Sequence, residues 1–237
     1  MNTNIDGLQV FLYDSVTSTF DVAKQLMTTH EKGVVISKTQ TKGKGKGTRK
    51  FASNDGGLYF TIFLKNLSFN QSFLLKTVIN AGLSVYDVLV SLGFDAKLKW
   101  PNDVLIKGKK VCGILSECTI CGDKADFMCG VGINVNSTCF DEFDDVATSL
   151  YVQSGKLFDI DEFANLVVDK VYKNLFDDSD NTKRFFDASK MLGKTVLVTD
   201  ANESYTAKIT GISPDGFLYG QKNGIQTKIV CGDIKEV

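Results

Sequence analysis

An apolar stripe along one long predicted helix limits the folds open to this chain. Between about residues 71 and 92, apolar side chains recur at spacings of 4, 3, 4, 3 and 4 residues. The stripe consists of Leu74, Val78, Ala81, Val85, Val88 and Leu92. Side chains at this spacing share one helical face, which has to be buried against another layer of structure.

Aromatic and β-branched segments on both sides of this helix predict that the second layer is a β-sheet. Two further helices are expected, the first with Ser18 or Thr19 as N-cap and Gly33 just beyond its C-terminus, the second with Asp159 and Glu162 as a capping box. The helices should span about residues 19–32 and 162–176, and the strands 10–13, 34–37, 58–64, 97–100, 104–106, 111–120 and 127–135. The acidic stretch 141–145 predicts a solvated loop.

The last part of the chain has a different pattern. From Gly193 onward it consists of short β segments separated by turn sequences such as Pro214-Asp-Gly and Asn223-Gly. This pattern predicts a small SH3-like β-barrel. The expected fold class is therefore α/β (α+β), with a mixed-sheet domain and flanking helices at residues 1–188 and the barrel at 189–237.

Composition excludes several classes of protein. The 237 residues include 27 basic and 28 acidic side chains, and this balance argues against a surface devoted to nucleic acid or to a membrane. No run approaches the roughly 18 apolar residues of a membrane helix, and no signal sequence is evident, so a cytoplasmic protein with reduced thiols is expected. His30 is the only histidine, and Cys118 and Cys121 form an isolated C-x-x-C, so no zinc site is expected.

A glycine–lysine segment at residues 38–50 breaks the periodicity. Three alternating glycines let the backbone approach a ligand closely, and the cations complement phosphate or carboxylate. A flexible basic surface loop is the alternative interpretation. The dinucleotide fingerprint and the Walker A motif are both absent. The segment carries six cations and no acid: Lys38, Lys42, Lys44, Lys46, Arg49 and Lys50.

A second polar segment, KWPND at residues 99–103, directly follows a predicted strand. It contains the only tryptophan, and it offers an amide and a carboxylate where the strand ends; a simple turn is the alternative. On the strand that follows, Lys110 could point toward an anion. Gly113 on the same strand would let a flat ligand approach the backbone.

These segments together resemble the biotin–protein ligase family. The resemblance rests on Gln40 through Phe51, KWPND, GKKVCGILSE at 108–117 and GVGIN at 130–134, and its order and spacing extend from about Tyr13 to the C-terminal barrel. It implies an ATP-dependent ligase that activates biotin as biotinyl-5′-adenylate and transfers it to a specific lysine of a biotin carrier domain. ATP and Mg²⁺ would serve as cofactors and biotin as the substrate.

The resemblance also implies roles for individual residues. The catalytic residues would be Lys110, Arg49 and Asp103, with Asp103 also the metal candidate. The biotin-binding residues would be Ser18, Thr19, Gln40, Gly43, Lys44, Gly45, Lys46, Lys110, Gly113 and Gly132. The ATP- or adenylate-binding residues would be Lys46, Arg49, Phe51, Trp100, Asn102 and Asn134.

The chain departs from the family pattern at three places. Thr17 and Phe20 stand where Asp and Asn are usual on either side of Ser18-Thr19, lysines replace arginines within residues 43–49, and Phe51 replaces a tryptophan. Because lysine lacks the bidentate geometry of arginine, we expect the adenylate to be held less tightly. A lipoate-type (octanoyl or lipoyl) protein ligase and a biotin-sensing regulator are the alternatives.

The expected partner is the biotin carrier domain of a biotin-dependent carboxylase. About a dozen residues precede the first predicted strand, so an N-terminal helix-turn-helix and a nucleic-acid partner are not expected. No membrane partner is expected either. The resemblance is compatible with a homodimer.

Overall fold

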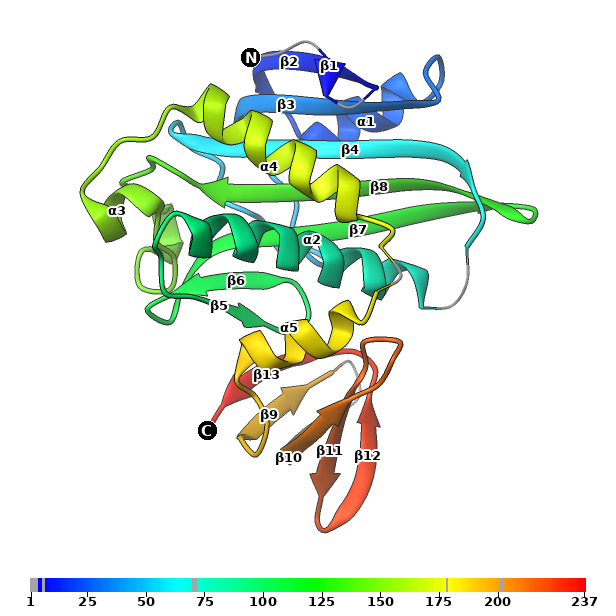
Figure 1. Ribbon diagram of the computed structural model, residues 1–237, viewed down its shortest axis with the longest axis vertical. Coiled ribbons are helices and arrows are strands. Elements are labelled where there is room, and N and C mark those ends of the chain that lie inside the picture. Colours follow the sequence, from blue (N-terminus) through cyan, green and yellow to red (C-terminus); the bar gives the residue numbers. More distant parts are fainter. Residues whose placement is uncertain (1–3, 6, 70–71, 178, 201–202) are drawn as a thin grey trace.

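The computed structural model describes residues 4–5, 7–69, 72–177, 179–200 and 203–237. Within these residues the chain forms an eight-stranded mixed sheet and a five-stranded antiparallel sheet (Figure 1). The fold class expected from the sequence is confirmed. The domain boundary at residue 188 stays a prediction.

The larger sheet has the strand order β1-β2-β3-β4-β8-β7-β6-β5. Its strands are β1 (Asn4–Ile5), β2 (Leu8–Val16), β3 (Lys32–Gln40), β4 (Gly57–Leu67), β5 (Ala96–Lys99), β6 (Asp103–Ile106), β7 (Lys109–Cys121) and β8 (Lys124–Asn134). The pair β2 and β3 is parallel, and α1 (Thr19–Leu26) makes the crossover between them. The remaining pairs are antiparallel.

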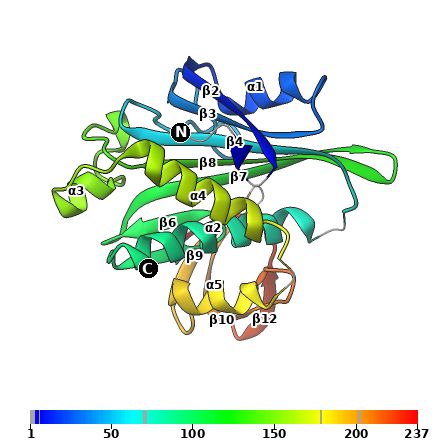
Figure 2. The same cartoon turned by 45° about the horizontal axis from the view of Figure 1, so that its top comes forward.

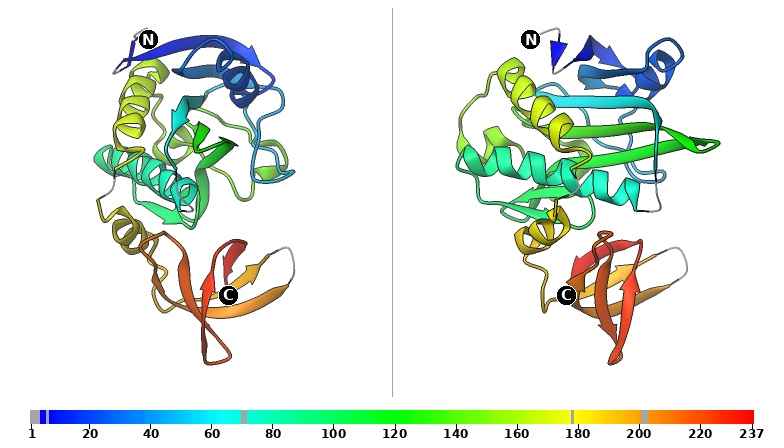
Figure 3. Two further views of the ribbon diagram at one scale, coloured as in Figure 1. Left: turned by 90° about the vertical axis from the view of Figure 1, so that its right-hand side faces the viewer. Right: turned by 45° about the vertical axis from the view of Figure 1, so that its right-hand side comes forward.

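Two helices, α2 (Phe73–Ser91) and α4 (Ile160–Asn174), pack together across one face of this sheet (Figure 2). Successive side chains of a strand point to opposite faces. On β3, Val34 therefore joins the core beneath these helices, whereas Val35 joins a smaller cluster with Phe20 of α1. Figure 3 shows α1 and the segment after β3 on the side opposite to α2 and α4. Helix α1 covers only one end of the sheet face on which it packs.

Helix α2 confirms the predicted apolar stripe. Val78, Ala81, Val85 and Val88 are buried, whereas Leu92 lies beyond the end of the helix and is exposed. One expectation needs correction, because α2 is long and apolar enough to cross a membrane by length and composition. More than half of that stretch is buried inside the protein, as expected for a core helix.

The smaller sheet has the strand order β12-β11-β10-β9-β13 and contains the C-terminal strands predicted from the turn sequences. Its strands are β9 (Thr195–Thr199), β10 (Ser204–Ile212), β11 (Leu218–Lys222), β12 (Ile225–Ile229) and β13 (Asp233–Glu236). Asn223 and Gly224 both adopt positive φ in the turn between β11 and β12, as the Asn-Gly sequence predicts.

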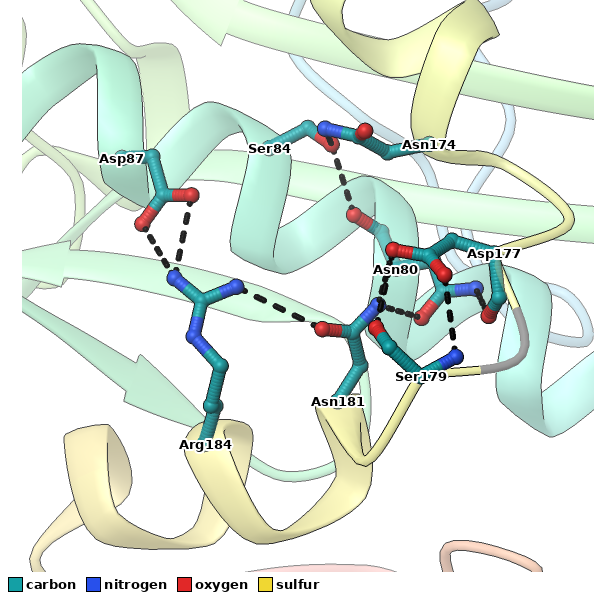
Figure 4. Close-up of polar contacts among 8 residues, drawn as sticks. All are labelled: Asn80, Ser84, Asp87, Asn174, Asp177, Ser179, Asn181 and Arg184. Atoms are coloured by element: carbon teal, nitrogen blue, oxygen red, sulfur yellow. Dashed lines mark hydrogen bonds and ion pairs between the residues drawn. The ribbon is translucent and has the colours of Figure 1, made fainter.

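Helix α5 (Asn181–Ser189) connects the two sheets and packs on β5 and β10. A polar network fixes it to α2 (Figure 4). The amide of Asn80 donates to the carbonyl oxygens of Leu175 and Asp177 and accepts from Asn181, and Arg184 pairs with Asp87 at 3.1 Å. Because Asn80 and Leu175 are buried, the bond between them satisfies a backbone carbonyl after α4 inside the protein.

The sequence predicts that the first helix continues to about residue 32, which is too far. Helix α1 stops at Leu26, and β3 already begins at Lys32. Gly33 is a strand residue, where an added Cβ would lie 2.7 Å from Phe63 and 2.9 Å from Phe11. The sequence-based assignment also missed α5 and the short helix α3 (Leu150–Ser154), and it treated Asp141–Phe143, a 3₁₀ helix, as a loop.

Candidate active site

A cavity of about 770 Å³ opens on the part of the larger sheet that α1 leaves uncovered. Its walls include strands β7 and β8, residues 44–52 and 140–147, and strands β9 and β13 of the smaller sheet. The start of α1, the end of β3 and the segment 99–105 also contribute to the lining. Pockets of this size suit small molecules and nucleotides. The acidic side chains of the stretch 141–145 are exposed, as predicted, whereas Phe140, Phe143 and Val146 contribute to the cavity wall.

Three glycines lie on the strands that form the floor of the cavity. Gly113 on β7 pairs with Gly132 on β8, and Leu115 pairs with Gly130. A Cβ added at Gly132 would lie 2.7 Å from the ring of Phe51. Because these positions lack Cβ atoms, the Phe51 ring and the Lys110 side chain lie close against the backbone. That Gly113 also admits a flat ligand stays a prediction.

A chain of hydrogen bonds crosses one end of the cavity. The Thr61 hydroxyl donates to Thr19 Oγ1 at 2.8 Å, Thr19 donates to Gln40 Oε1 at 3.1 Å, and Gln40 Nε2 donates to Ser53 Oγ at 2.9 Å. Thr19 and Gln40 also line the cavity. Sequence reasoning missed Thr61 and Ser53, which lie outside the recognised motifs.

Ser18 and Gly43 occupy structural positions behind this wall. The buried Ser18 hydroxyl accepts from the Phe20 N–H and caps α1, as predicted from the sequence. Gly43 lies so close to the Phe51 carbonyl oxygen and to Ser53 Oγ that a Cβ would collide with both. Neither Ser18 nor Gly43 is among the described residues that line the cavity.

Residues 43–51 form a short hairpin, which we call the lid. The Phe51 N–H donates to the Gly43 carbonyl oxygen at 3.0 Å, and the Gly45 N–H donates to that of Arg49 at 2.8 Å. Within the glycine–lysine segment these hydrogen bonds define a hairpin whose cations are exposed.

Two ion pairs hold the lid. The Nζ atom of Lys44 lies 2.5 Å from Oδ1 of Asp21 on α1. Arg49 contacts Asp233 on β13, with Nη1–Oδ2 and Nη2–Oδ1 distances of 3.1 Å. The lid thus connects α1 with the smaller sheet across the cavity.

Lys110 and Asp103 form the charged centre of the site. The Nζ atom of Lys110 lies 2.6 Å from Oδ1 of Asp103 and 5.5 Å from the centroid of the Phe51 ring. The Lys110 backbone is held by hydrogen bonds with Val146 and Thr148. The ammonium group expected to face an anion therefore lies in the cavity wall, already paired with a carboxylate.

Three residues predicted to bind the nucleotide donate side-chain hydrogen bonds to backbone carbonyl oxygens. The Trp100 indole is 3% exposed and donates to the Gly216 carbonyl oxygen at 2.9 Å. Asn102 donates to the Ile114 carbonyl oxygen and Asn134 to that of Thr148. These side chains line the cavity, and their hydrogen bonds also hold its walls together.

A resident metal does not fit this site. In the part of the chain that the structure describes, no group of three or more His, Cys, Asp or Glu residues could hold an ion. The charge of Asp103, the predicted ligand, is compensated by Lys110. A Mg²⁺ ion brought by a nucleotide needs few protein ligands, because it keeps waters and substrate phosphates in its shell.

Titratable groups around the cavity have identifiable environments. Burial raises the pKa of the Tyr59 phenol, which lies edge-on to Phe51 and donates to the Asn54 carbonyl oxygen. His30 is not among the cavity residues; its ring lies edge-on to Phe11 at 5.0 Å.

The cavity collects most of the predicted site residues. They are Thr19, Gln40, Lys44, Gly45, Lys46, Arg49, Phe51, Trp100, Asn102, Asp103, Lys110, Gly113, Gly132 and Asn134. Which ligand each one binds stays a prediction. Sequence reasoning missed the contribution of the smaller sheet, including Asp233, because no local motif marks it.

Comparisons with known proteins agree with this geometry. The Biotin/lipoate A/B protein ligase family matches residues 12–134, and the Biotin protein ligase C terminal domain matches residues 191–234. The bifunctional ligase/repressor BirA of Bacillus subtilis is 28% identical over 247 residues, covering 99% of this chain and 76% of that protein. The biotin–[acetyl-CoA-carboxylase] ligase of Paracoccus denitrificans is 34% identical over 105 residues, 43% of each chain.

A solved structure is similar over nearly the whole chain. The biotin protein ligase from Aquifex aeolicus in complex with biotin and ATP gives a TM-score of 0.82 at 30% identity and covers 96% of this chain and 98% of that one. The first family match contains the lid, the glycine floor and the Lys110–Asp103 pair. The chain therefore belongs to the biotin/lipoate A/B protein ligase family.

Proposed function

We propose that this protein joins biotin to ATP as biotinyl-5′-adenylate and transfers the biotinyl group to a lysine of a biotin carrier domain. The observation that carries this proposal is the cavity itself, where the cationic lid and Lys110 face a glycine floor. The similar Aquifex structure was solved with biotin and ATP. The carrier would belong to a biotin-dependent carboxylase, which fits a cytoplasmic reaction.

The first step brings two anions together. A carboxylate oxygen of biotin attacks the α-phosphorus of ATP, a P–O bond forms, and pyrophosphate leaves. Biotin's carboxylate is already ionised at neutral pH, so no enzyme nucleophile or histidine is required. Lys110 would orient this carboxylate, and Lys46 with the lid backbone would offset charge on the phosphate. Mg²⁺ bound to ATP would offset charge on the leaving pyrophosphate.

The second step consumes the mixed anhydride. The uncharged amine of the carrier lysine attacks the biotinyl carbonyl carbon, a C–N bond forms, and AMP leaves with the electron pair of the broken C–O bond. The amine passes one proton to Asp103 or to water in this step. We assign Asp103 to orienting that amine, because it is the carboxylate beside Lys110 in the cavity wall.

The polar chain from Thr61 to Ser53 supports biotin over lipoate as the substrate. A ureido ring has two N–H donors and a carbonyl acceptor that can join the hydroxyl and amide groups of Thr19 and Gln40. Octanoyl and lipoyl chains offer no such groups and would leave these polar groups without ligand partners.

Mass spectrometry of an acceptor protein tests the proposal. A biotin carrier domain is incubated with the protein, ATP and Mg²⁺, and with biotin, lipoate or octanoate in separate reactions. We expect the biotinyl mass on one lysine in the biotin reaction only. An unmodified carrier in that reaction, or modification by lipoate or octanoate instead, would contradict the proposal.

A further inference from the structure

Arg49 is the one arginine among the six cations of residues 38–50. All three of its side-chain nitrogens have partners. Nη1 and Nη2 lie on the two oxygens of Asp233, each at 3.1 Å, and Nε donates to the Lys46 carbonyl oxygen at 3.3 Å. This parallel, two-point pairing needs a planar guanidinium, and a lysine cannot form it.

The backbone places Asp233 for this contact. Asp233 begins β13 and pairs with Thr199 of β9. Gly232 directly before it has a φ of 121° and lies so close to Thr199 that an added Cβ would meet its carbonyl oxygen at 2.9 Å. The close backbone packing at Gly232 therefore fixes where β13 begins, and with it the position of the Asp233 carboxylate at the edge of the cavity.

The same guanidinium cannot serve two anions with the same N–H groups. Resemblance to the family assigns Arg49 to the adenylate, whereas in the structure three of its five N–H groups point to Asp233 and Lys46. Lys44 holds the other strand of the lid to Asp21 on α1. The lid is therefore fastened on both sides, and its two fastenings lie on separate parts of the fold.

We propose that Asp233 is a positioning residue that latches the lid to the smaller sheet through Arg49 and so retains the activated acyl-adenylate. A mixed anhydride reacts with water and with free amines, so it has to stay enclosed until the acceptor lysine arrives. The latch depends on protein contacts alone. Its role in retention rests on the proposed function.

Limited trypsin digestion tests the latch without any substrate. The lid contains trypsin cleavage sites after Lys44, Lys46, Arg49 and Lys50, which are cut faster when the lid opens. In Asp233→Asn, which leaves the lid sequence intact, we expect cleavage there to accelerate by about 1.5- to fivefold, the range for an exposed ion pair. Glu236→Gln is the matched control, because Glu236 is also on β13 and pairs with Lys194 away from the lid.

The second measurement is the release rate of biotinyl-adenylate from the protein. Asp233→Asn and Arg49→Lys should each accelerate release by a similar factor, and the double variant should be no faster, because both changes remove one interaction. Wild-type digestion and release in Asp233→Asn, equal acceleration in Glu236→Gln, or additive effects in the double variant would each overturn the latch. If no adenylate forms at all, the proposed function fails, and the digestion result still decides the latch.

Discussion

The ammonium group of Lys110 lies 2.6 Å from the carboxylate of Asp103, and the two side chains are 33% and 18% exposed. The two residues come from neighbouring strands, β7 and β6, near an irregularity in their pairing. Each charge limits the rotation of the other, so the ammonium group is oriented before a substrate binds. Preorganised charge of this kind is a major source of catalysis.

Replacing Lys110 with alanine should reduce biotin-dependent ATP–pyrophosphate exchange by about 100-fold or more, the usual effect of losing one preorganised donor. The variant leaves Asp103 without its counter-charge. Lys109→Ala is a suitable control, because the Lys109 ammonium contacts the Asp144 carbonyl oxygen on the exposed surface. Exchange at the wild-type level in Lys110→Ala would remove Lys110 from the mechanism.

Hydrogen exchange should detect stabilisation of the lid by its ligands. We expect amides of residues 43–51 to exchange more slowly when biotin and ATP are both present, because the ligands add contacts beneath the hairpin. The distant β11–β12 hairpin provides an internal reference. Equal exchange of the lid amides with and without ligands would show that the lid does not respond to them.

The glycine floor should not tolerate a methyl group. In Gly132→Ala the new Cβ would lie 2.7 Å from Phe51 and push the ring into the cavity. Overpacking of this kind costs about 1–3 kcal/mol, so we expect biotin or ATP to bind about tenfold more weakly in calorimetric titrations. Gly211→Ala is the control, since a Cβ there meets no atom within 4 Å. Unchanged affinity in Gly132→Ala would contradict the assigned floor.

Trp100→Phe should loosen the contact between the two sheets. It deletes the indole N–H and leaves the Gly216 carbonyl oxygen without that donor in a buried position, which costs about 1–3 kcal/mol. We expect a lower urea midpoint, followed by far-ultraviolet circular dichroism because Trp100 is the only tryptophan. A midpoint equal to the wild type would mean that this hydrogen bond adds no stability.

The cysteines should differ in reactivity. Burial raises the pKa of the Cys112 thiol, and it raises that of Cys129 to about 12. Alkylation of the native protein near pH 8 should label the exposed Cys139 and Cys231 and spare the two buried thiols, as peptide mass spectrometry can show. Because these pKa values are raised on folding, their contribution to stability is present below about pH 9 and is lost as the pH rises toward the folded values.

Much of the fold could be predicted because its signals are local. The stripe of α2 and the Asn223-Gly224 turn each follow from a few neighbouring residues. Gly33 was misassigned because a glycine after a helical pattern suits a helix end equally well, and only Phe63 and Phe11, distant in sequence, show why it lies in a strand. Helix α5 escaped prediction because it is short and its N-cap makes no side-chain hydrogen bond.

Part of the candidate site could also be predicted from the sequence. Lys110, Asp103 and the lid belong to compact motifs, so their residues could be named from the sequence. Asp233 could not, because its pairing with Arg49 spans 184 positions and depends on the placement of the smaller sheet. Ser18 belongs to a motif as well; its hydroxyl oxygen caps α1, and its predicted contact with biotin stays a prediction.

Strand β13, which forms part of the cavity wall, is the last of the described strands to be synthesised. A ribosome produces the lid and the glycine floor early, whereas the strand carrying Asp233 emerges after every other described strand. Until then, the nascent chain holds a pocket that is open on one side. A partly made chain would lose a reactive anhydride to the surrounding solution, so the ability to retain it arises only when translation has reached β13.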